Sequence, residues 1–276
     1  MEPTDQSLHR FLRGFTADAA PWRYLPEDFC VRRARDYHLY DQNGIRYVDF
    51  WQHNGSAVLG HRVSGVNRAV KDQLDRGPLV PIPNQRFNRA SKQLPRAIAE
   101  IGFADCRATA FLGLDGLRAL DELLAPDAAS GESQPVRVVV WRPFGSIEPE
   151  DGIRADLVVL ALPVPLPEAP IPVAGLTKTG VDALATLATR DAGRRSTGPH
   201  TWAAVSHVLS SLPHAVRSQR PSRLNAAKGL SVPTGFLRNG VYLVAPDTWD
   251  GERWGQLVRS GFSRGIILPG DPTAPI

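Results

Sequence analysis

Two almost entirely apolar segments in the middle of the chain constrain its fold more than any other feature. They are Val136–Trp141 and Asp156–Leu162, and neither shows the alternation of polar and apolar residues that marks a strand with one solvated face. Such runs are typical of strands in a parallel sheet that is covered on both faces. Apolar residues recur at helical spacing in the segments around them, at 64–76, 88–101, 115–124, 180–190 and 200–212. We therefore predict an α/β protein.

A β-hairpin is indicated nearer the N-terminus. Residues 39–50 form two alternating runs around Asn43-Gly44, a dipeptide that favours the tight turns of hairpins. Short strands are expected again towards the other end, at Val241–Val244 and Ile266–Leu268. Because these elements flank the strand–helix alternation, we expect a small lobe assembled from both termini beside a larger α/β domain.

Five prolines follow the second apolar run closely, at positions 163, 165, 167, 170 and 172. Proline has no backbone N–H and a fixed φ, so this spacing argues against a helix and against a central strand. It predicts extended polyproline geometry instead. The later segment Arg217–Lys228 is polar and basic, and is expected to be a connection.

The hairpin and the residues after it match a known pattern. Asp41–Asp49 reads D-x-x-G-x-x-Y-x-D, and Leu59-Gly60-His61 reads L-G-H before a segment with helical spacing. In these motifs the chain resembles the class III aminotransferases, pyridoxal phosphate (PLP) proteins of fold type I that include glutamate-1-semialdehyde aminomutase. Ser64 stands where that family has a proline. The clear resemblance covers residues 25–101, and weaker, collinear similarity continues beyond them.

The resemblance implies a reduced PLP-transferase fold of type I, with a shortened parallel-sheet large domain and a small α+β lobe from both termini. On this alignment residues 1–85 are the N-terminal part of the small lobe and an interface segment. Residues 86–212 are the reduced α/β large domain, and residues 213–276 are the C-terminal part of the small lobe. Only about 20 residues separate the turn at Gly116 from the strand at Val136, where the family has much of its large domain.

Residues of other types occupy the positions that hold PLP in the family. Leu162 stands at the position of the Schiff-base lysine, and leucine has no nucleophile. Leu114, after Gly113, replaces the hydroxyl residue of the turn that binds the cofactor phosphate at a helix start. Trp141 and Arg142 stand where an aspartate pairs with the pyridinium nitrogen, and a cation there would oppose protonation of the ring.

Ser196 and Thr197 complete the set of family positions, in a segment that resembles the family's S-G-N-P turn. Because the lysine, the hydroxyl and the aspartate are all replaced, we expect no bound cofactor and no catalytic residue. The resemblance then implies a non-catalytic homologue, or pseudoenzyme, that acts in protein assembly or regulation. Since family members are dimers, the expected partner is a second copy or an active aminotransferase paralogue.

Two alternatives remain open. Lys178, which lies between two threonines, is the best other candidate for a Schiff-base lysine. With that lysine the protein would be an active PLP-dependent aminotransferase or aminomutase. In the second alternative, the former cofactor cleft binds a small anion without forming a covalent bond to it.

Composition also bears on the cellular location and on the possible partners. No apolar run is long enough to cross a bilayer, and the first residues are too polar for a secretory signal. Cys30 and Cys106 suggest neither a disulfide framework nor a metal site. We therefore expect a cytoplasmic protein with no membrane partner. The net charge of +4 is small, and the basic residues between 190 and 228 have few aromatic residues among them, which argues against a nucleic-acid partner.

Overall fold

The computed structural model describes residues 8, 11–12, 20–52, 56–77, 85–124, 136–144, 155–164, 166, 169–190, 197–228, 237–239, 242–244 and 250–271. The chain forms two compact units. The first comprises residues 1–9, 64–143 and 147–221, and the second comprises residues 10–63, 144–146 and 222–276. The second unit takes segments from both ends of the chain. Its main boundaries with the first unit fall at 63 and 222. The predicted segment 1–85 combined the small lobe with an interface segment, and the C-terminal part of the lobe was predicted from 213.

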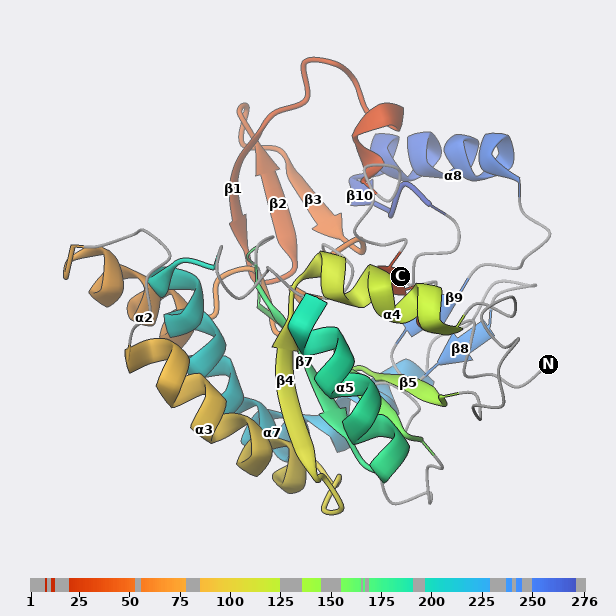
Figure 1. Ribbon diagram of the computed structural model, residues 1–276. Helices are drawn as coiled ribbons and strands as arrows, with labels where there is room; N and C mark the ends of the chain where they lie inside the picture. The colour runs from red at the N-terminus through yellow and green to blue at the C-terminus, as the bar shows by residue number, and fades with distance from the viewer. Residues whose placement is uncertain are drawn as a thin grey trace. The chain divides into compact units, whose positions relative to one another are not determined.

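The first unit is built on a four-stranded mixed sheet (Figure 1). Its strands, in spatial order, are β4 (Ala108–Leu112), β7 (Ile171–Gly175), β6 (Leu157–Leu160) and β5 (Val138–Trp141). Every residue of β5, β6 and β7 is buried, which explains why their sequences do not alternate. The α/β architecture is therefore confirmed.

The expectation of a parallel sheet holds only for β5 and β6. β7 is antiparallel to both of its neighbours, β4 and β6. Only residues 161–170 join β6 to β7, which is too short for the crossover that a parallel pair needs. The chain therefore reverses direction, and β4, β5 and β6 all run opposite to β7.

Pro172 lies within central strand β7, contrary to the expectation from the proline spacing. It is paired with Phe111 of β4, but β6 pairs only with Val173–Gly175. Pro172 thus occupies the end of the strand where the second ladder has already stopped. A residue without an N–H is tolerated there because no second partner requires it.

The described helices of the first unit are α2 (Ser64–Leu74), α3 (Gln85–Glu100), α4 (Leu114–Leu124), α5 (Lys178–Arg190) and α7 (Pro199–Lys228), of which α7 ends beyond 221. Figure 1 shows α5 in front of β4 and β7, with α3 and α7 beside β4. Trp202 of α7 is buried and meets Phe87 of α3 and Phe111 of β4 edge-on, with ring centroids 5.0 and 4.9 Å apart. These aromatic contacts join two helices to the sheet.

Helix α7 is longer than expected. It continues through the polar segment 217–228, which the sequence indicated as a connection. Arginine, alanine, glutamine and lysine are good helix formers, so a polar composition alone does not end a helix that has already begun. Where α2 crosses α7, a Cβ added at Gly65 would overlap the ring of His207. A residue without a side chain lets the two helices approach closely.

The second unit contains a four-stranded sheet in the order β1 (Val31–Arg35), β2 (His38–Asp41), β3 (Arg46–Asp49) and β10 (Ile266–Ile267). The hairpin predicted around Asn43-Gly44 is confirmed by the antiparallel pairing of β2 and β3. Gly44 has φ +83°, a left-handed conformation that glycine adopts without strain. Asp41 Oδ1 accepts hydrogen bonds from the backbone N–H groups of Asn43 and Ile45, at 2.9 and 2.8 Å.

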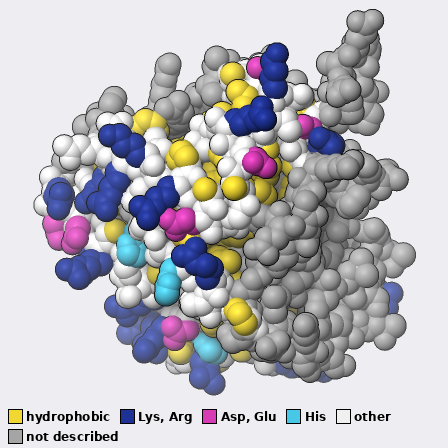
Figure 2. All heavy atoms as spheres, turned by 90° about the horizontal axis from the view of Figure 1, so that it is seen from below, with side chains coloured by type: hydrophobic (Ala, Val, Ile, Leu, Met, Phe, Trp, Pro, Cys, Tyr) yellow, Lys and Arg dark blue, Asp and Glu magenta, His cyan; other side chains and the backbone are white. Residues whose placement is uncertain are grey.

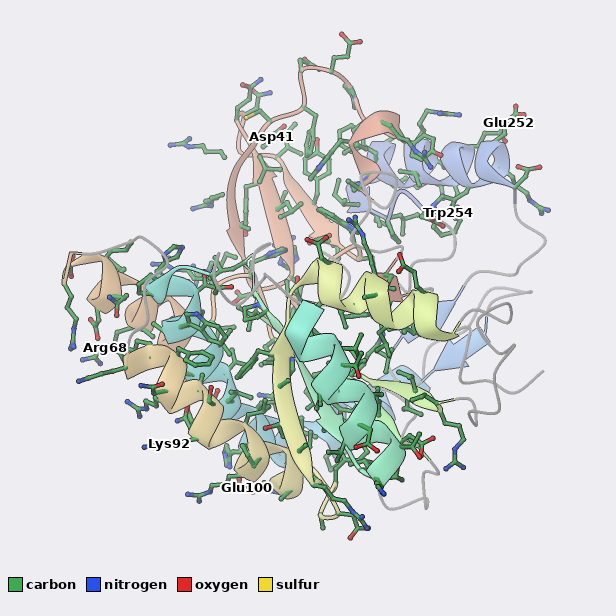
Figure 3. All side chains as sticks on the ribbon, in the orientation of Figure 1. Asp41, Arg68, Lys92, Glu100, Glu252 and Trp254 are labelled. Carbon is green, nitrogen blue, oxygen red and sulfur yellow. The ribbon has the colours of Figure 1, made fainter. Side chains whose placement is uncertain are left out.

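The other elements described in the second unit are η2 (Pro21–Tyr24), α8 (Gly251–Ser263) and the hairpin of β8 (Leu237–Asn239) and β9 (Tyr242–Val244). One face of the sheet packs with α8 in an apolar core. The buried members of this core are Leu25, Leu39, Tyr47, Trp254, Val258 and Ile267. Trp254 is a buried residue of α8 (labelled in Figure 3), and its indole N–H donates to the carbonyl oxygen of Pro269 at 2.8 Å.

Candidate functional site

The candidate site is one edge of the first unit's sheet. Because β4, β5 and β6 run in the same direction, their carboxyl ends meet at a common edge, here called the carboxyl edge. β4 leads to Gly113 and Leu114, β5 ends at Trp141, and β6 leads to Leu162. Three segments that lie far apart in the sequence are therefore brought to the edge where open α/β sheets bind ligands.

Leu162 follows β6 at this edge. Trp141 and Leu160 are direct partners across the two strands, and the N–H of Ala161 donates to the Trp141 carbonyl at 2.9 Å. Leu162 continues the chain with its own N–H bonded to the Leu160 carbonyl at 2.9 Å. Its side chain is half-buried, and Pro163 and Val164 after it are buried. The position offers apolar contact and no amine.

Gly113 and Leu114 form the turn between β4 and α4. The Leu117 N–H donates to the Gly113 carbonyl at 3.2 Å, so Gly113 caps the helix and α4 begins at Leu114. This is the strand–turn–helix arrangement that presents first-turn N–H groups to an anion. Asp115, however, already places a carboxylate in the first turn, where it complements the helix dipole itself.

Trp141 and Arg142 occupy the end of β5. Trp141 is completely buried, and its indole N–H has no hydrogen-bond acceptor among the described residues. Arg142 is half-buried and interacts with other groups. No acid stands at this position, so nothing here would pair with a protonated pyridine nitrogen. A large indole instead fills the space at the end of the strand.

Thr197 is buried just before α7, and Ser196 lies outside the described residues. Among the described residues of the carboxyl edge, Leu162, Trp141 and Arg142 provide neither an amine for the aldehyde of PLP nor an acid for its ring. These described residues do not fit the cofactor.

Lys178 is not part of the carboxyl edge. It is the first residue of α5 and follows β7, the strand that runs the other way. The carboxyl end of β7 lies beside the start of β6, where Leu157 is paired with Gly175. Lys178 is exposed there, at the opposite edge of the sheet from Leu162.

A polar cluster that the sequence reasoning did not identify lies beside Lys178. Asp156 accepts hydrogen bonds from the Thr177 hydroxyl at 2.7 Å and from the backbone N–H and Nε of Arg137 at 2.9 and 3.2 Å. Burial alone would raise the pKa of Asp156, but the hydrogen bonds from Arg137 and Thr177 outweigh it and hold that pKa below its ordinary value. The sequence signal that could have identified this cluster is the position of Asp156, an acidic residue immediately before an apolar strand.

A second buried acid lies in the other unit. Asp49 Oδ2 is 2.6 Å from Nε2 of His61, and the Asp49 side chain has no exposed surface. Asp49 Oδ1 also accepts the Gln52 N–H at 3.0 Å. The backbone N–H of His61 donates to the Asp36 carbonyl at 2.7 Å. The L-G-H motif thus ties the end of β3 to the turn between β1 and β2.

Within the described residues, no three His, Cys, Asp or Glu side chains are grouped so as to hold a metal ion. The described helices also include none that is long and apolar enough to cross a membrane.

Comparison with known proteins identifies relatives of part of the chain. No family model matches it. It is 43% identical over 54 residues to an uncharacterized protein of Borreliella burgdorferi, a match that covers 20% of each chain. It is 34% identical over 80 residues to glutamate-1-semialdehyde 2,1-aminomutase of Methanocaldococcus jannaschii, covering 29% of this chain and 19% of the enzyme. The matched segments thus span about a fifth of the length of these curated relatives.

Solved structures match over almost the whole chain. A β-phenylalanine aminotransferase from Variovorax paradoxus has a TM-score of 0.57 and 16% identity, covering 99% of this chain and 92% of that one. A glutamate-1-semialdehyde aminomutase from Pseudomonas aeruginosa PAO1 has a TM-score of 0.53 and 14% identity, covering 97% and 91%. The fold is that of the class III PLP-dependent aminotransferases, and the resemblance predicted from the motifs is confirmed.

Proposed function

We propose that the chain is a non-catalytic homologue of the class III aminotransferases that acts in protein assembly or regulation. The observation that carries the proposal is Leu162, which follows β6 at the carboxyl edge. The motif resemblance aligns this residue with the family's lysine. A residue without a nucleophile cannot form a Schiff base. The cytoplasm is the proposed location, since Cys30 and Cys106 are both free thiols.

The surroundings of Leu162 support the same proposal. Trp141 is packed against the end of the neighbouring strand, and Arg142 brings a cation where the ring nitrogen would need an acid. Restoring one residue would therefore not restore the site. Lys178 would need the cofactor to bind at the other edge, where the described acid, Asp156, is already bonded to Arg137 and Thr177.

A PLP titration tests the loss of cofactor binding. Purified protein is mixed with PLP and its visible absorbance is recorded, and a portion is then reduced with borohydride so that peptide mass spectrometry can locate any adduct. We expect no stoichiometric adduct at any lysine. Lys178→Ala is the control, and Lys92→Ala, at an exposed lysine of α3, is its matched surface comparison. A visible band in the wild type that disappears only in Lys178→Ala would contradict the proposal and favour the alternative of a PLP enzyme that uses Lys178.

The assembly role is tested separately. Light scattering after size-exclusion chromatography gives the mass of the pure protein alone and mixed with an intact class III aminotransferase. A dimer or a mixed complex is the expected result. A stable monomer that also fails to bind the intact enzyme would contradict the assembly role and leave the loss of cofactor binding standing.

A further inference from the structure

The sheet of the second unit has a face that the core does not use. In β1–β3, the strand register groups Ala34, Leu39 and Tyr47 on the face that packs with α8. Side chains alternate along a strand, so the intervening residues point the other way. That second face, called the outer face, presents Arg33, Arg35, His38, Tyr40, Arg46 and Val48.

The charge of the outer face is positive. The two aspartates of these strands, Asp41 and Asp49, alternate onto the packed face and are buried. Asp36, in the turn after β1, lies 3.6 Å from Nε of Arg35 and balances that one arginine. Arg33 and Arg46 are left as exposed cations on the two sides of Tyr40, with which both are paired across the strands.

Tyr40 lies between these two cations, and the exposed apolar side chains of Val48 and Phe50 lie farther along the chain from Arg46. The guanidinium carbon of Arg33 is 4.2 Å from the centre of the Tyr40 ring, a cation–π contact that holds the guanidinium over the ring. Phe50, two residues beyond Val48 in the same alternation, is 41% exposed, and Val48 is 36% exposed. Within the described second unit, α8 lies on the other side of the sheet, against the packed face.

We propose that the outer face binds single-stranded nucleic acid. Arginines on an open sheet neutralise phosphates, while aromatic rings and guanidinium planes stack on bases. A phenyl ring can reach the face of a base only when the base is not already stacked in a duplex, which selects single strands. The inference is independent of the cofactor question, because none of these residues belongs to the carboxyl edge.

The described exposed side of α3, in the first unit, does not offer the same combination. Arg89, Lys92 and Arg96 lie along the exposed side of α3, but Arg96 is paired with Glu100 at 2.7 Å. Phe87, the aromatic residue of α3, is turned into the contact with Trp202. In the view from below, Lys and Arg side chains lie among Asp, Glu and His side chains (Figure 2). The described side of α3 therefore has charge but no exposed aromatic ring.

The sequence alone did not reveal this face. Arg33, Tyr40 and Arg46 are seven and six residues apart, on three different strands. They become neighbours only through the register of the two β-hairpins. The basic segment that is continuous in sequence, between 190 and 228, has no such interleaving of aromatic residues.

The test is fluorescence polarisation of a labelled oligo(dT) of about 12 nucleotides, within the site sizes of single-strand-binding folds. The full-length protein is titrated at several salt concentrations between about 50 and 200 mM. We expect saturable binding that Phe50→Ala weakens by about fivefold or more. Arg46→Gln should weaken binding and reduce the slope of log K against log salt by about 0.7, the value for one phosphate contact to a single strand.

Arg259→Gln on α8 is the matched control, since it removes the same charge from an exposed position off the outer face. It should leave the slope unchanged. Arg33→Gln provides a second variant on the face in case Phe50→Ala does not fold, as judged by circular dichroism. Equal effects of Arg259→Gln and Arg46→Gln would overturn the proposal, because they would show non-specific attraction.

Two other probes test whether the outer face binds a different kind of ligand. Polyglutamate of matched charge tests for an acidic protein surface, and phosphatidylserine vesicles test for a membrane. Binding of either probe with the same dependence on Phe50, and as tightly as oligo(dT), would overturn the assignment to nucleic acid. Failure of oligo(dT) to bind at the lowest salt concentration would do so as well.

Discussion

The Thr177 hydroxyl lies 2.7 Å from Oδ1 of Asp156 and joins the segment after β7 to the residue before β6. The Asp156 carbonyl accepts the Leu176 N–H at 2.9 Å, so side chain and backbone close the same corner. Arg137, before β5, completes the cluster with both its backbone and its guanidinium. One carboxylate therefore fixes the starts of two strands and of α5.

Asp156→Asn should lower the free energy of unfolding near neutral pH by about 1–3 kcal/mol. The native contacts lower the pKa of this carboxyl, so the ionised form contributes stability above the ordinary aspartate pKa of about 3.9. That contribution is lost as the pH falls through the lowered native pKa. Urea unfolding of both proteins across this pH range should show a difference that shrinks towards low pH. A constant difference would contradict the assignment.

Gly180→Ala should destabilise the protein although it lies inside α5. An added Cβ would overlap the Asp156 carbonyl oxygen. Because this oxygen belongs to the backbone, relieving the overlap requires a backbone shift, which costs stability. Alanine otherwise favours a helix by about 1 kcal/mol over glycine. Gly251→Ala, at the start of α8, is the control because its added Cβ would have no atom within 4 Å. Thermal melting should move down for Gly180→Ala and stay or rise for Gly251→Ala.

Much of this architecture could be predicted from local patterns. The Asn43-Gly44 turn and the apolar runs of β5 and β6 are decided by residues close together in sequence. The direction of β7 could not be read in that way, because it depends on a connection too short for a crossover. The hydrogen-bond partners of Asp156 could not be predicted either, since its donors lie 19 and 21 residues away in the sequence.

His61→Ala should destabilise the second unit by about 1–3 kcal/mol, because it leaves the buried carboxylate of Asp49 without its side-chain partner. The Gln52 N–H still donates to the other oxygen and limits the loss. His214→Ala, at an exposed position of α7, should change stability by less than about 0.5 kcal/mol. Urea unfolding would compare the two, and equal effects would show that the Asp49 contact is not stabilising.

Trp141→Phe should cost less stability than Trp254→Phe. Both indoles are completely buried, so both substitutions remove the same volume and create a cavity of similar size. Trp254→Phe also removes the hydrogen bond to the Pro269 carbonyl and leaves that oxygen without its donor. Trp141→Phe removes an N–H that has no acceptor among the described residues. The difference in the free energy of unfolding should be about 1 kcal/mol. If Trp141→Phe is as costly, the indole at the end of β5 has an acceptor outside the described part of the chain, and the carboxyl edge is more fully hydrogen-bonded than its described residues indicate.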